Sequence, residues 1–145
     1  MNIGYLDCFS GISGDMLLGA LIDAGLPEAE LHAVAGDLGL TGCRLEIAST
    51  AGSPLRATRV RVQVDSPQPH RHLPEIEAIL NAAPLAPPVR ERSLAIFRRL
   101  AEAEAEVHGC TPAEVHFHEV GAADALLDIV GAVQGFHFLD IDKLF

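Results

Sequence analysis

The segment LRATRVRVQV (55–64) most constrains the fold, because apolar and polar side chains alternate along it. In an extended strand, Val60 and Val62 lie on one face and Arg59 and Arg61 on the opposite face. One face is therefore predicted to be buried and the other to be basic and hydrated. A domain that contains such a strand needs other elements to cover the apolar face.

The other elements are predicted from apolar periodicity, helix caps and turn residues. The sequence predicts strands at 3–9, 43–49, 55–64 and 115–120 and helices at 13–25, 27–39, 73–83, 89–109 and 122–139. The first strand is short and apolar, so we expect it to be buried. This order predicts an α+β domain, or an α/β layered one, with a small mixed sheet and about five helices.

Length and charge limit the class of protein. A chain of 145 residues that is 49% hydrophobic can form one globular domain, 1–145, with a substantial core. The net charge is −10, and 1–43 carry six acidic residues and no basic one, whereas 100–145 carry nine acidic residues and one basic one. Such acidic ends argue against nucleic-acid binding, which requires a basic surface, and the acidic C-terminal third would attract divalent cations.

The cysteines and the N-terminus indicate a compartment. Cys8, Cys43 and Cys110 form no CxxC pair, and an odd number of cysteines suits free thiols in a reducing cytosol. No apolar run is long enough to span a membrane, and MNIGYLDCFSG has no basic region like that of a signal peptide. We therefore expect a cytoplasmic protein that does not contact membranes.

The stretch VHFHEVGAADALLDIVG carries most of the candidate chemistry. His116 and His118 would share one face of a strand, and Asp124 and Asp128 one face of the following helix. With Glu119 between them, these imidazoles and carboxylates are the ligand types that nickel and zinc accept. The alternative interpretation is an exposed strand followed by hydrated acidic residues.

A second histidine pair, His70 and His72, lies in the Pro-rich loop DSPQPHRHLP before a helix. A mobile loop with this pair can collect a metal ion without belonging to the chemical centre. As an isolated feature, the pair is also compatible with an ordinary hydrated loop.

A Gly-rich turn follows the first predicted strand and leads into a helix. Free backbone N–H groups and the positive end of the helix dipole favour a phosphate there, and an acidic side chain can face a cation. Ordinary helix capping is the alternative. The candidate residues are Asp7, Ser10, Gly11, Ser13, Gly14 and Asp15.

Four segments together resemble one protein family. They are DCFSGISGDMLLGALIDAG, HRHLPEIEAIL, IFRRLAEAEAEVHG and VHFHEVGAADALLDIVGA, and the similarity extends to about Lys143. In order and spacing they resemble the nickel-insertion proteins of nickel-pincer cofactor synthesis, the LarC family. The first and last of these motifs are long and specific.

This resemblance implies a CTP-dependent cyclometallation. Pyridinium-3,5-bisthiocarboxylic acid mononucleotide receives Ni(II), the product serves lactate racemase, and CTP with Mn or Mg is split to CMP and diphosphate. Family members are two to three times as long as this chain. The resemblance therefore implies an N-terminal domain without the C-terminal nucleotide-binding region, which a missing half or a split-gene partner would supply.

Within this function, removal of a ring proton needs a base, which we expect among His118, Glu119 and Asp124. Nickel must be held by nitrogen and oxygen ligands and then released to two sulfurs. The expected metal ligands are His116, His118, Glu119, Asp128, His70 and His72. The alternatives are a divalent-metal-dependent hydrolase and a non-catalytic nickel-binding module.

The last predicted helix is expected to present an apolar surface to the missing part of the protein. Its residues around Leu126, Ile129, Val133 and Phe136 form the expected patch. An exposed patch of this kind usually finds a partner, so self-association is expected.

Overall fold

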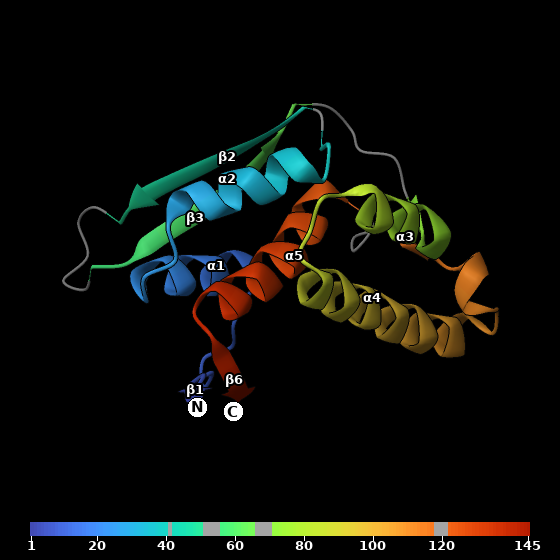
Figure 1. The fold of residues 1–145 in the computed structure, drawn as a ribbon. Helices are drawn as coiled ribbons and strands as arrows, with labels where there is room; N and C mark the ends of the chain where they lie inside the picture. The colour runs from blue at the N-terminus through green and yellow to red at the C-terminus, as the bar shows by residue number, and fades with distance from the viewer. Residues whose placement is uncertain (41, 51–55, 66–70, 118–121) are drawn as a thin grey trace.

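The computed structural model describes residues 1–40, 42–50, 56–65, 71–117 and 122–145 (Figure 1). In these ranges the α-helices are α1 (Gly14–Asp23), α2 (Glu28–Asp37), α3 (Leu73–Ala82), α4 (Pro87–His108) and α5 (Ala123–Phe138). The strands are β1 (Asn2–Gly4), β2 (Cys43–Ser49), β3 (Thr58–Val64), β4 (Arg71–His72), β5 (His116–Phe117) and β6 (Ile141–Leu144), and Pro112–Glu114 form the 3-10 turn η1. The α+β prediction is confirmed.

The strands pair two by two. β2 and β3 form an antiparallel sheet, β4 and β5 form a second, and β1 and β6 form a parallel sheet. In β3, Val60 is buried, whereas Arg59 and Arg61 are exposed, so the predicted alternation is confirmed. This buried face of the β2–β3 sheet packs on α1 (Figure 1).

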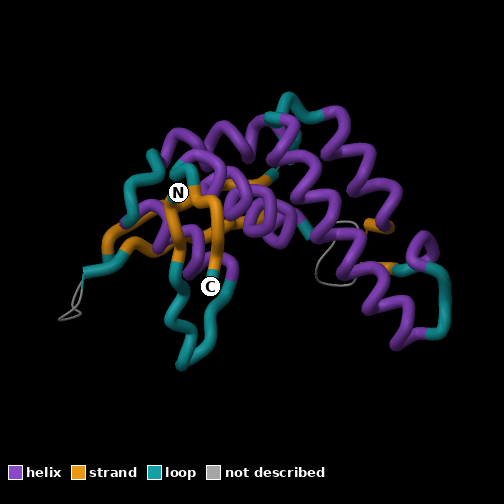
Figure 2. The backbone as a smooth tube through the Cα atoms, turned by 60° about the horizontal axis from the view of Figure 1, so that its bottom comes forward, coloured by secondary structure: helices purple, strands orange, loops and turns teal. Residues whose placement is uncertain are grey.

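Helix α5 is the centre of the molecule. It packs against α1 and α2 on one side and against α4 on the other (Figure 1), and Figure 2 shows the clustered helices in purple from a second direction. Leu126, Leu127 and Val130 of α5 are buried, as is Phe97 of α4. Because helices from both halves of the sequence contact α5, its position fixes the geometry of the core.

None of the described helices combines the length and the apolar character that a membrane crossing requires.

The junction between α1 and β3 is unusually close. A Cβ atom on Gly19 would overlap the carbonyl oxygen of Thr58. Asp23, one helical turn later, accepts hydrogen bonds from the Thr58 hydroxyl at 2.7 Å and the Thr58 N–H at 3.0 Å. The hydroxyl bond is the largest cause of the lowered pKa of Asp23, followed by the N–H bond. Glycine therefore sets the distance at which the helix meets the strand.

Two predictions about the ends of the chain were wrong. The first strand covers Asn2–Gly4 rather than 3–9, and Ile3 is 53% exposed, because the strand pairs only with β6 at the edge of the molecule. On α5, Leu126 and Val133 are buried against the core instead of forming an exposed patch. Of the four residues predicted to form the patch, Ile129 and Phe136 are partly exposed.

Candidate functional site

Two of the predicted metal ligands face each other across the β4–β5 pair. His72 of β4 lies opposite His116 of β5 in the strand register, and their ring centroids are 3.9 Å apart. The Nδ1 atom of His72 is 3.1 Å from the carbonyl oxygen of Val115, and in the tautomer with the proton on Nδ1 this N–H donates a hydrogen bond to that oxygen. In that tautomer Nε2 carries the ring lone pair, as in a metal-binding histidine oriented by a backbone carbonyl.

Local structure places the two histidines. His72 is the N-cap of α3, and its backbone N–H donates to the Glu75 carboxylate at 2.7 Å. In β5, the neighbours Val115 and Phe117 are both 2% exposed, whereas His116 is exposed. The alternation of the strand therefore turns His116 outward, toward the side on which His72 lies.

The other predicted ligands of this group, His70, His118 and Glu119, lie outside the described residues. Within the described ranges, no group of three or more His, Cys, Asp and Glu side chains could hold a metal ion. The structure thus brings together one histidine from each predicted pair. The participation of the other three residues stays a prediction.

Asp128 of α5 lies in a different setting, at the start of α1. Its Oδ1 atom is buried and has no hydrogen-bond partner among the described residues. A Cβ atom on Gly14 would overlap this carboxylate, so glycine is needed for α1 to pass so close. Burial, followed by the negative charges of Asp15 and Asp124, raises the pKa of Asp128 to about 6.

The Gly-rich turn leads into the first turn of α1, which carries Asp15 and lies beside Asp128. Gly11 has a φ of 84°, and its N–H donates to the carbonyl of Cys8 at 2.9 Å. Ser13 is the N-cap of α1, but its hydroxyl bonds to the Asp15 carboxylate, which also accepts the N–H of Met16. The remaining candidates, Asp7 and Ser10, are exposed. A phosphate cradle at this turn stays a prediction, as do the catalytic role of Asp124 and the metal-binding role of Asp128.

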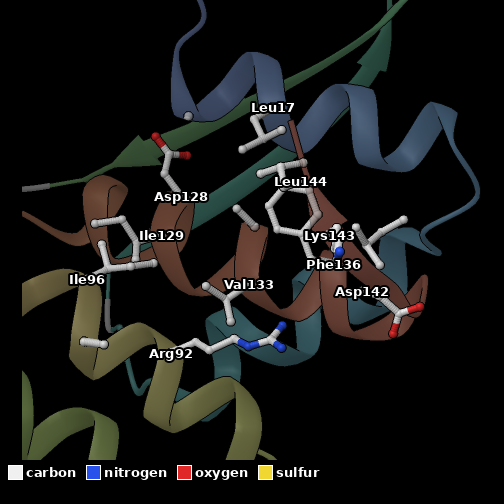
Figure 3. A pocket seen from close by; sticks show the side chains of 14 residues that line it. Leu17, Arg92, Ile96, Asp128, Ile129, Val133, Phe136, Asp142, Lys143 and Leu144 are labelled. Atoms are coloured by element: carbon white, nitrogen blue, oxygen red, sulfur yellow. The ribbon is translucent and has the colours of Figure 1, made fainter. Parts of the chain in front are cut away.

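Sequence reasoning did not predict the pocket into which Asp128 points. This cavity of about 570 Å³ lies between α1, α4, α5 and β6 (Figure 3). Its walls are largely apolar, and its charged lining residues are Asp128, Arg92, Asp142 and Lys143. Its volume is within the range of small-molecule sites. The pocket combines α1, α4 and the α5–β6 segment, which are separate in sequence, so no local motif indicates it.

Comparison with known proteins identifies the family. A model of the nickel insertion protein family matches residues 4–145. The chain is 50% identical over 145 residues to the pyridinium-3,5-bisthiocarboxylic acid mononucleotide nickel insertion protein of Desulfitobacterium hafniense, covering all of this chain and 36% of that protein. It is also 50% identical over 145 residues to a protein of Thermomicrobium roseum whose name describes nickel insertion, covering 99% of this chain and 36% of the relative.

The chain thus spans about a third of the length of these relatives. No solved structure matches it. The match covers nearly the whole chain and includes both histidine strands, the Gly-rich turn and α5. The chain therefore belongs to the nickel insertion protein family.

Proposed function

We propose that this chain takes part in inserting nickel into pyridinium-3,5-bisthiocarboxylic acid mononucleotide. The observation that carries the proposal is the facing pair His72 and His116, because family membership supplies nickel as the substrate and the pair supplies two imidazoles to receive it. The name of the Desulfitobacterium hafniense relative supports the organic substrate.

Two imidazoles suit a transfer site for nickel. Neutral imidazole binds Ni(II) well, yet two nitrogen ligands hold the ion less firmly than a closed thiolate site would. His118 and Glu119 join this proposed ligand set, and metal binding by His70 and Asp128 remains a prediction. Loss of the ring proton requires a base near the bound ion, and His118, Glu119 and Asp124 are the proposed candidates. Nickel then passes to the sulfurs of the substrate.

The finer parts of the proposal concern the whole protein. We propose that the reaction consumes CTP with Mn or Mg and that its product serves a lactate-racemase-type apoenzyme. The chain covers 36% of its relatives' length, so it would supply the metal and substrate part while other polypeptide binds the nucleotide. The three free thiols, Cys8, Cys43 and Cys110, support a reducing cytoplasm.

Nickel titration by calorimetry tests the metal site. The double variant His72→Ala, His116→Ala is expected to bind nickel at least tenfold more weakly, about 1.4 kcal/mol, because both imidazole ligands are lost. The matched control is His32→Ala, His137→Ala, which removes two exposed histidines from α2 and α5. Equal nickel affinity of the two double variants would show that the facing pair does not bind nickel.

CTP turnover tests whether the nucleotide is bound by the part of the protein that this chain does not cover. The isolated chain is expected to release no CMP from CTP, and mixing it with the part of the Desulfitobacterium hafniense relative that it does not cover is expected to restore turnover. The control omits nickel and the organic substrate. CTP turnover by the isolated chain contradicts this assignment of nucleotide binding, and metal-dependent phosphoester hydrolysis would favour a hydrolase instead.

A further inference from the structure

The β1–β6 pair is a small sheet with uncovered surfaces. Its two strands are parallel, and in the described ranges no third strand pairs with either of them. Parallel strands are usually covered on both faces, and a sheet of two strands is only marginally stable by itself. Here Ile3 and Leu144 are half exposed, and the pair lies at one end of the molecule, apart from the β2–β3 sheet (Figure 1). This end can therefore accept further polypeptide.

The exposed apolar side chains of the molecule gather around this pair. Among the described residues, most of the large hydrophobic side chains that are exposed lie within 1–16 and 138–145. The Leu6 N–H donates to the Phe145 carbonyl at 2.7 Å, and the Phe145 N–H donates to the Gly4 carbonyl at 2.9 Å, so the loop after β1 begins beside the end of β6. Apolar groups that gather in this way mark a contact surface. We call this surface the apolar end and define it by Ile3, Tyr5, Phe9, Met16, Leu144 and Phe145.

The pocket described above adjoins the apolar end, because Leu144 belongs to both. The Asp128 carboxylate lies in the pocket wall (Figure 3), and its Oδ1 atom is buried without a hydrogen bond among the described residues. A cation or hydrogen-bond donor beside this oxygen would recover the free energy that its isolation costs. The charged groups that influence it, Asp15 and Asp124, are both negative. A basic side chain that enters from outside would fit here.

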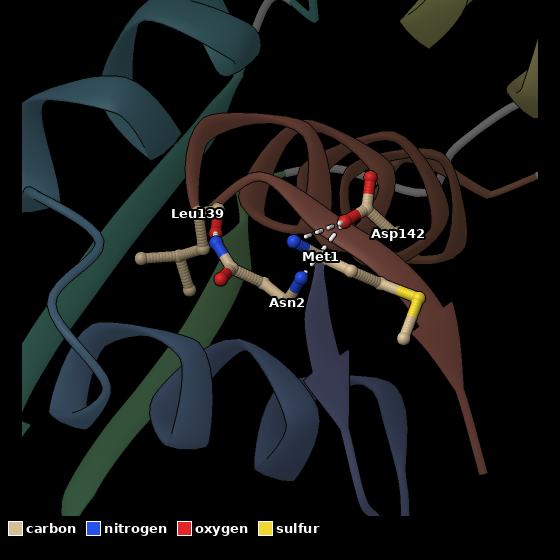
Figure 4. A network of polar contacts seen from close by, with 4 residues as sticks. All are labelled: Met1, Asn2, Leu139 and Asp142. Carbon is tan, nitrogen blue, oxygen red and sulfur yellow. Dashed lines mark hydrogen bonds and ion pairs between the residues drawn. The ribbon is translucent and has the colours of Figure 1, made fainter.

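Charge distinguishes a second copy of this chain from a different polypeptide. Lys143 is the only basic side chain in 1–16 and 138–145. Asp142 accepts the backbone N–H of Asn2 at 2.8 Å and lies 3.7 Å from the N-terminal ammonium (Figure 4). Two copies of this surface would bring like charges together, which opposes association, whereas apolar and basic side chains would complement it. The exposed acidic side chains of the two segments are Asp7, Asp15, Asp140 and Asp142.

We propose that the apolar end and the adjoining pocket dock the remaining polypeptide, meaning the part of a relative that this chain does not cover. It would add a strand beside the β1–β6 pair and direct a basic side chain at Asp128. This inference rests on the proposed function, in which other polypeptide completes the protein. The chain covers 36% of each relative, so most of their length is available as the occupant. The sequence prediction differs, since it placed the partner surface along α5 and expected self-association.

Calorimetry measures docking between the 145-residue chain and the remaining polypeptide of the Desulfitobacterium hafniense relative, without nickel, CTP or the organic substrate. The wild-type chain is expected to bind it. Phe9→Ser and Tyr5→Ser are each expected to weaken binding about tenfold, because docking would bury these aromatic side chains. Phe9 is 89% exposed and Tyr5 is 76% exposed, so both variants are expected to fold. The matched control is Val107→Ser on α4, which removes an 82% exposed apolar side chain and is expected to leave binding unchanged.

Asp128→Asn tests the contribution of the pocket. It is expected to weaken docking about tenfold, because the carboxylate would accept a charge-assisted hydrogen bond that the amide cannot replace. The same substitution is expected to stabilise the isolated chain, so weaker docking of this variant could not result from unfolding. Glu91→Gln, which removes an exposed carboxylate of α4 outside the pocket lining, is the control and is expected to dock normally.

The inference is overturned if the wild-type chain does not bind the remaining polypeptide, or if Phe9→Ser and Tyr5→Ser bind it as tightly as Val107→Ser does. Unchanged docking of Asp128→Asn overturns the contact with the pocket. Sedimentation of the wild-type chain alone is expected to give a monomer, and a dimer that Phe9→Ser dissociates would show that a second copy occupies the surface instead. Nickel titration of the histidine pair uses the isolated chain, so failure of docking is distinguishable from failure of the proposed function.

Discussion

Gly19→Ala is expected to lower the free energy of unfolding by about 3 kcal/mol. The added methyl group would overlap the backbone carbonyl of Thr58, and a backbone atom cannot move away as a flexible side chain can. Helix α1 must therefore shift away from β3, which weakens the two hydrogen bonds between Thr58 and Asp23. Urea unfolding followed by circular dichroism measures the loss.

Gly36→Ala is the matched control for this prediction. Gly36 lies inside α2, and apart from its chain neighbours and the helix's own nearby backbone no described atom lies within 4 Å of the position that its Cβ would occupy. Alanine there is expected to stabilise the protein by about 0.5–1 kcal/mol, because it favours the helix more than glycine does. If the two variants have similar stability, α1 does not approach β3 as closely as described.

Asp128→Asn is expected to raise the free energy of unfolding at pH 7.5 by about 1–2 kcal/mol, after allowance for the partial exposure of the side chain. Burial and the neighbouring acids raise the folded-state pKa of Asp128 from its usual value of 3.8 to about 6. The folded state therefore holds this proton more firmly than the unfolded state does. The resulting stability is fully present below about pH 4 and is lost as the pH rises through 6.

The pH dependence separates this effect from a simple change in packing. The stabilisation by Asp128→Asn is expected to be clearly smaller at pH 4.5 than at pH 7.5, because the wild-type carboxyl is then mostly protonated. Glu91→Gln, which removes an exposed carboxylate from α4, is expected to change stability by less than about 0.5 kcal/mol at both pH values. A stabilisation by Asp128→Asn that is equal at both pH values would refute the pKa argument. A carboxylate that costs stability at neutral pH is typical of a binding site.

The sequence predicted the helices well because their signals are local. Helix α5 was predicted at 122–139 and covers Ala123–Phe138, and α3 and α4 each differ from their predicted bounds by two residues or fewer. Their apolar periodicity and the proline and glycine residues at their ends act within a few positions. The β2–β3 pair was predictable for the same reason, since both strands alternate and adjoin in sequence.

Features that depend on distant residues were not predictable. Each HxH pair suggested a site of its own, yet His72 meets His116 through the register of two strands that lie far apart in sequence. The spacing of Asp124 and Asp128 predicted that their side chains share one face of a helix. It could not show that Asp128 is buried, because that depends on Gly14 in another helix. Strand β6, four residues long, has no clear signal without its partner β1.

The pairing of β1 with β6 also bears on the order in which the molecule forms. Asn2 and Asp142 are 140 positions apart, so closing this contact costs about 2 kcal/mol more entropy than closing a ten-residue loop. The pair buries little in return, since Ile3 and Leu144 remain half exposed. It should therefore close last during folding and open first in the native protein. Because Ile141–Leu144 also line the pocket, local opening of the β1–β6 pair would let a ligand enter and leave while the helical core stays folded.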